Sequence, residues 1–68
     1  MKVRDALRLL RAHGFTLERQ TGSHRQLTGV VGGRRRLVTV AGQEGDDIRS
    51  GTLAAIRRQS GLPRRLFR

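Results

Sequence analysis

The spacing of apolar residues changes along the 68 residues from helical to strand-like and back to helical, and this order limits the fold. Near the start, four apolar residues follow the i, i+3, i+4, i+7 spacing of one helix face. They are Val3, Ala6, Leu7 and Leu10. This spacing predicts a helix over residues 3–13, and Gly14 follows it as the expected left-handed stop. A helix this short needs a partner surface for its apolar face.

Alternating apolar residues in the middle of the chain predict three strands joined by glycine-containing turns. The expected strands cover residues 15–20, 24–28 and 36–40, with a turn at 21–23 and a loose loop at 29–33. A second helix is predicted over 51–60, with Ser50 as its N-cap and Gly61 as its stop. Pro63 is expected to begin a short final turn that returns Leu66 or Phe67 to the core.

The elements together predict a single α+β domain over residues 1–68, in the order α-β-β-β-α with a three-stranded antiparallel sheet. Both helices have to bury their apolar stripes on one face of the sheet, since neither is long enough to stand alone. The other face is then free to meet solvent or a partner. This is the topology of double-stranded-RNA-binding domains.

Charge is the next constraint, because 15 basic residues stand against five acidic ones, for a formal net charge of +10. Such an excess attracts polyanions, and arginine suits phosphate better than lysine does. The chain has no cysteine, which excludes disulfides and thiolate metal sites. No apolar run approaches the ~20 residues of a membrane span. We therefore expect a soluble cytoplasmic protein that binds nucleic acid or an acidic partner and contacts no membrane.

His24 is the candidate catalytic residue, because it opens a predicted strand directly after the Gly22–Ser23 turn. Arg19 and Arg25 flank it in sequence, so its imidazole is expected to lie where a phosphodiester would bind. Imidazole serves in acid/base catalysis near neutral pH, but it is also common on ordinary surfaces, and the residue types alone leave both readings open. His13 is expected instead to cap the last turn of the first helix.

RNA cleavage needs few protein groups, since the 2′-hydroxyl is an internal nucleophile. An imidazole supplies acid/base chemistry, and positive charge stabilises the developing phosphorane. Besides Arg19 and Arg25, the run Arg34, Arg35 and Arg36 is a candidate for that charge, or else a solvated stretch at the start of a strand. Gly22 and Ser23 of the turn are also expected to contact the RNA. No cofactor is expected, and the two distant histidines with an acidic stretch at 44–47 offer no typical metal-ligand spacing.

With these segments placed, the chain resembles the HicA family of toxin messenger-RNA interferases of bacterial toxin–antitoxin pairs. The motifs that carry the resemblance are His13-Gly14-Phe15, Gly22-Ser23-His24, Val38-Thr39-Val40, Gly51-Thr52-Leu53 with Ile56, and Gln59-Ser60-Gly61-Leu62. The resemblance implies a double-stranded-RNA-binding-like fold, an endoribonuclease acting on mRNA with His24 as its catalytic residue, and a HicB-like antitoxin that covers that histidine.

One loop departs from the family's pattern. Many members follow the Val-Thr-Val strand with a proline and a second histidine, whereas Ala41-Gly42-Gln43 stands here. This departure predicts weaker or differently selective activity. Two other readings stay open: a non-catalytic RNA-binding module of the same fold, and an interaction protein whose charge recruits an acidic partner. The free chain is expected to be a monomer.

Overall fold

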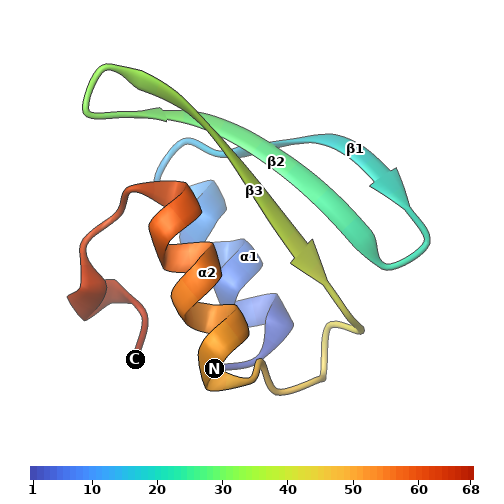
Figure 1. Cartoon of the computed structure of the whole chain (residues 1–68). Helices are drawn as coiled ribbons and strands as arrows, with labels where there is room; N and C mark the ends of the chain where they lie inside the picture. Colours follow the sequence, from blue (N-terminus) through green and yellow to red (C-terminus); the bar gives the residue numbers. More distant parts are fainter.

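A computed structural model describes all 68 residues and has the predicted α-β-β-β-α order (Figure 1). Its elements are α1 (Val3–Ala12), β1 (Thr16–Thr21), β2 (His24–Val31), β3 (Arg34–Ala41), α2 (Ser50–Ser60) and the 3₁₀ turn η1 (Arg64–Leu66). The strands form one antiparallel sheet in the order β1-β2-β3, and both helices lie on the same side of it. The fold class expected from the sequence is confirmed.

One small core joins the helices to the sheet. Its most buried members come from α1, β2, β3 and α2 and from the segments that flank them. They are Val3, Leu7, Leu10, Phe15, Leu27, Val38, Val40, Ile56, Leu62 and Phe67. The apolar stripe read from the first helix is therefore its buried face, and Phe67 folds back as expected after the 3₁₀ turn. No helix of the protein is both long enough and apolar enough to cross a membrane.

The β2–β3 hairpin is longer than expected, and the prediction of a loose loop over residues 29–33 is wrong. β2 continues to Val31, β3 already begins at Arg34, and only Gly32 and Gly33 lie between them. Both glycines have positive φ, +62° and +75°, as a two-residue type I′ turn requires. Gly29 is a strand residue whose missing side chain leaves room for the Phe15 ring.

The helix ends agree with the sequence to within one residue, and the predicted cap is wrong only at the start of α2. His13 occupies the C-cap of α1, where its Nδ1 lies 2.9 Å from the Leu9 carbonyl oxygen, and Gly14 follows with φ +88°. Gly61 ends α2 with φ +69°. Ser50, however, is the first helical residue and not the N-cap: Arg49 is the last extended residue, and its carbonyl accepts the Leu53 N–H at 2.9 Å.

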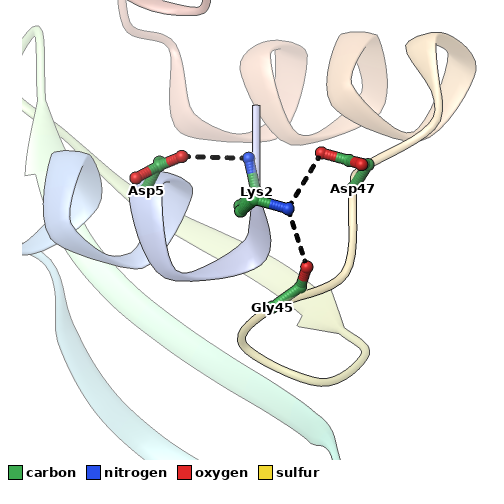
Figure 2. A network of polar contacts seen from close by, with 4 residues as sticks. All are labelled: Lys2, Asp5, Gly45 and Asp47. Carbon is green, nitrogen blue, oxygen red and sulfur yellow. Dashed lines mark hydrogen bonds and ion pairs between the residues drawn. The ribbon is translucent and has the colours of Figure 1, made fainter.

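The start of the chain holds the acidic loop that connects β3 to α2. The backbone N–H of Lys2 donates to Asp5, while the Lys2 ammonium donates to the Gly45 carbonyl at 3.1 Å and lies 3.6 Å from the Asp47 carboxylate (Figure 2). The backbone amide of Val3 also donates to Asp46, at 2.9 Å. These contacts fix the later part of a loop that has no apolar periodicity. Its first residues lie beside the β1–β2 turn, because the Gly42 N–H donates to the Ser23 carbonyl at 3.2 Å.

Candidate active site

His24 is the first residue of β2 and lies on the sheet face that the helices leave open. Its cross-strand partners are Thr21 on β1 and Ala41 on β3. The adjacent pair, Arg25 with Val40, points the other way, because successive strand residues face opposite sides and Val40 belongs to the core. The His24 imidazole is therefore exposed on the free face, where a large ligand has access to it.

A shallow polar hollow of about 190 Å³ surrounds this histidine. No apolar residue lines it; its walls are Arg19, Thr21, His24, Gln26 and Thr39, drawn from all three strands. These side chains supply one cation, one imidazole and three neutral hydrogen-bonding groups. Such a set suits a charged phosphodiester with polar neighbours better than it suits an apolar ligand.

Arg19 reaches this hollow because of an irregularity in β1. Leu17 pairs with Leu27 on the helix-facing side, yet Arg19 pairs with Gln26, so Glu18 is an extra, bulged residue. Strict alternation forward from Leu17 would place Arg19 on the same side as Leu17. The bulge shifts the register by one residue and brings Arg19 to the face of His24.

Arg25, which directly follows His24 in the sequence, lies on the helix-facing side. Its guanidinium donates to the Gly42 carbonyl at 2.9 Å and to the Ser23 carbonyl at 3.3 Å. The Ser23 carbonyl also accepts the Gly42 N–H at 3.2 Å. Arg25 thus ties the turn before His24 to the loop after β3.

The turn itself is a two-residue connection in which Gly22 has φ +58° and Ser23 does not have positive φ. This is the pattern of a type II′ hairpin turn, which needs glycine at its first central position. Gly22 and Ser23 therefore set the point at which β2 begins, and with it the face on which His24 emerges. Their predicted contact with RNA stays a prediction.

The arginine run at the start of β3 is divided between the two faces. Arg35 pairs across the sheet with Val30 on the open face, and its guanidinium lies 2.9 Å from the Glu18 carboxylate. Arg34 and Arg36 point to the helix side, where Arg36 donates to the Val31 carbonyl at 3.3 Å. Of the five arginines predicted to bind RNA, only Arg19 lines the hollow around His24.

Three residues of the hollow were not predicted as site residues: Thr21, Gln26 and Thr39, although Thr39 lies in the Val38-Thr39-Val40 motif. Each is an unremarkable polar residue of a strand, and only the cross-strand register, Thr21 with His24 and Gln26 with both Arg19 and Thr39, brings them together. The backbone of Thr39 is further held from α2, since its N–H donates to the Gln59 side chain at 3.1 Å. No group of three or more His, Cys, Asp or Glu side chains is placed to hold a metal ion.

The sequence model of the HicA toxin of bacterial toxin–antitoxin systems matches residues 3–62 of this chain. The chain belongs to the HicA toxin family. It is therefore a toxin of a toxin–antitoxin system. The match begins at the first residue of α1 and includes both helices and the whole sheet. No curated protein matches the chain. The HicA match includes every residue of the hollow and leaves only residues 1–2 and 63–68 outside it.

Proposed function

We propose that this HicA-family toxin is an endoribonuclease that cleaves mRNA by metal-independent acid/base chemistry centred on His24, and that a HicB-like antitoxin neutralises it. The observation that carries the proposal is the position of His24. It stands exposed on the free sheet face, in a polar hollow that also contains Arg19. The family match supports the toxin role, and the hollow supports a reaction on a phosphodiester.

The reaction uses the RNA's own nucleophile. The 2′-oxygen attacks the adjacent phosphorus, a new O2′–P bond forms and the P–O5′ bond breaks, giving a 2′,3′-cyclic phosphate and a 5′-hydroxyl. His24 takes the 2′-hydroxyl proton or delivers a proton to the leaving 5′-oxygen, and water completes the other transfer. Arg19 stabilises the charge on the phosphorane oxygens, while Gln26 and Thr39 offer hydrogen bonds to the nucleotide.

The same face offers a surface for a protein inhibitor. Val30 and Leu37 are 68% and 52% exposed, and both lie on the open side of the sheet. Val30 lies six residues along β2 from His24, so the apolar pair is toward the β2–β3 turn and the polar hollow is toward the β1–β2 turn. An antitoxin whose apolar centre packs on Val30 and Leu37, and whose polar margin extends along β2 and β3, would reach and cover His24.

The test compares His24→Ala with His13→Ala, because the two histidines of the chain occupy different environments. Each purified variant and the wild type are incubated with a long single-stranded RNA in the presence of EDTA. We expect His24→Ala to cut about 10²–10⁴-fold more slowly, the usual contribution of a general acid or base. His13→Ala loses only a helix-cap contact and should cleave as the wild type does wherever it remains folded.

Equal cleavage by wild type and His24→Ala would remove His24 from the mechanism. A 5′-phosphate in place of a 5′-hydroxyl on the downstream fragment would exclude attack by the 2′-oxygen.

One observation favours a second function, a non-catalytic RNA-binding module: no hydrogen bond within the protein orients the His24 ring. Intact RNA that is nevertheless shifted on a gel by the wild type would support that module.

A further inference from the structure

The last part of the chain carries an unbalanced positive charge that the hollow around His24 does not use. After Asp47 the sequence has no acidic residue and six arginines: Arg49, Arg57, Arg58, Arg64, Arg65 and Arg68. None of them is in an ion pair, since the three ion pairs of the protein are Lys2–Asp47, Arg8–Asp5 and Arg35–Glu18. This is the largest block of uncompensated charge in the protein.

Four of these arginines form one continuous surface, which we name the C-terminal arginine surface: Arg57, Arg64, Arg65 and Arg68. Phe67 is only 9% exposed and fixes the end of the chain against α2. On one side of it, Arg57 and Arg64 line a hollow of about 170 Å³. On the other, Arg64, Arg65 and Arg68 line a second hollow of about 330 Å³. Arg64 belongs to both and joins them.

This surface is remote from the candidate active site. In Figure 1 the C-terminal segment, drawn in red, runs beside α2 at one side of the molecule, while the β1–β2 turn that precedes His24 lies at the other. The family match ends at Leu62, so Arg57 lies within it and Arg64, Arg65 and Arg68 lie beyond it. The surface shares no residue with the hollow around His24.

We propose that the C-terminal arginine surface binds the phosphate backbone of the RNA at a distance from the bond that is cut. The proposal rests on the proposed function only in taking RNA as the ligand. Guanidinium groups bind phosphate oxygens with two parallel hydrogen bonds. Unpaired arginines on an exposed surface also displace the counterions condensed on a nucleic acid, which makes the binding salt-dependent. The longest dimension of the molecule is 31 Å. A stacked strand at about 3.4 Å per nucleotide covers it with about nine nucleotides.

A protein partner fits this surface less well than RNA does. Protein interfaces are centred on apolar or aromatic anchors that become buried on binding. The exposed large apolar residues of this chain are Leu17, Val30 and Leu37, and all three lie on the sheet. The apolar residues that line the first hollow, Leu53, Ala54 and Phe67, are not among the exposed large apolar residues of the protein. Unpaired arginines are the main exposed groups of this surface, which favours binding to a phosphate backbone.

The test measures RNA binding in a His24→Ala background, so that cleavage does not enter. The affinity for a fluorescent 20-nucleotide single strand is followed against salt for this parent and for three triple variants built on it. The first replaces Arg64, Arg65 and Arg68 by alanine, and the second replaces them by lysine. The third is a matched control with the same loss of charge, the exposed α1 residues Arg4, Arg8 and Arg11 changed to alanine. Thermal melting checks that each is folded.

We expect the C-terminal alanine triple to lose about ten-fold in affinity near 0.1 M salt. Its log–log salt slope should fall by about 2, from three phosphate contacts at about 0.7 each. The lysine triple should keep most of the slope, and the α1 control should lose less than about three-fold in affinity with its slope unchanged.

Equal losses of affinity in the two alanine triples would overturn the proposal, since overall charge alone would then explain binding. So would a C-terminal triple that binds RNA like its parent but loses affinity for poly-glutamate, which would assign the surface to an acidic protein.

The two proposals fail in different ways in these experiments. If the wild type never cleaves RNA but its salt slope depends on the C-terminal arginines, the nuclease proposal is refuted and the binding-surface proposal stands. If the wild type cleaves RNA through His24 but the C-terminal alanine triple binds RNA like its parent, the binding-surface proposal is refuted and the nuclease proposal stands.

Discussion

Replacing Gly29 by alanine should destabilise the protein through one contact. A Cβ at this position would lie 2.9 Å from Cγ of Phe15 and 3.0 Å from its two Cδ atoms. Carbon atoms in contact normally stay about 3.5–4.0 Å apart, so the new methyl overlaps the ring by roughly half an ångström or more. Phe15 is 1% exposed and packs within the core cluster, so its ring has no solvent-side space to move into.

Overpacking of this kind costs about 1–3 kcal/mol. The loss of glycine's freedom in the unfolded chain offsets about 0.4–1 kcal/mol of it. The net destabilisation is then about 1–2 kcal/mol. For a domain of this size it lowers Tm by about 5–15 °C, at about 4–8 °C per kcal/mol. Thermal unfolding followed by far-ultraviolet circular dichroism measures it directly.

Gly51→Ala is the matched control for the same chemical change. Gly51 is the second residue of α2, and nothing lies within 4 Å of the position that its Cβ would take. Alanine is the better helix former by up to about 1 kcal/mol, so this variant should melt at the wild-type temperature or a few degrees above it. A Gly29→Ala protein that melts no lower than Gly51→Ala would refute the close approach of β2 to the Phe15 ring.

Four further substitutions test contacts around the sheet, the end of α2 and the acidic loop. Arg25→Ala removes the hydrogen bonds that join the Ser23 and Gly42 carbonyls, so it should slow RNA cleavage and leave the salt slope of RNA binding unchanged. Arg19→Ala should reduce that salt slope, because Arg19 lines the hollow. Filter binding over a salt series distinguishes the two variants. Gly61→Ala puts a side chain at φ +69° and 2.7 Å from the Arg36 guanidinium carbon, and chemical denaturation should show a loss of about 1–2 kcal/mol or more. Lys2→Met should change stability by less than about 1 kcal/mol, because the pair with Asp47 is exposed; a larger loss would show that the loop depends on this contact.

The order of the elements could be read from the sequence because each apolar pattern had a distinct period and an unambiguous stop. The i, i+3, i+4, i+7 spacing from Val3 marked the buried face of α1, and Gly14 and Gly61 marked the ends of the two helices. The hairpin between β2 and β3 was missed because three glycines in five residues are typical of a loop. The first of them, Gly29, pairs with Arg36 within the β2–β3 ladder, and its lack of a side chain leaves room there for the Phe15 ring.

Only part of the candidate site could be predicted, because strand register decides which residues join His24 on its face of the sheet. His24 could be placed at the start of a strand because a glycine-containing turn precedes it. Its neighbours could not be placed, because Arg25 directly follows His24 and Arg19 lies five residues before it, yet only the more distant arginine shares its face of the sheet. The bulge at Glu18 decides which of them faces the hollow, and no pattern in the sequence reveals that bulge. Thr21, Gln26 and Thr39 join the site through strand pairing alone.

A net charge of +10 predicts a polyanion as partner, but the structure assigns the arginines to different tasks. Arg25 and Arg36 donate to backbone carbonyls, and Arg8 and Arg35 face acidic side chains. The hollow around His24 is left with a single unpaired cation, Arg19. For the proposed RNA binding, one arginine can stabilise the charge on a phosphorane but contributes only about 0.7 to the salt slope. The proposal of tight RNA binding therefore needs a second surface, and the C-terminal arginine surface is the group of unpaired arginines that offers one.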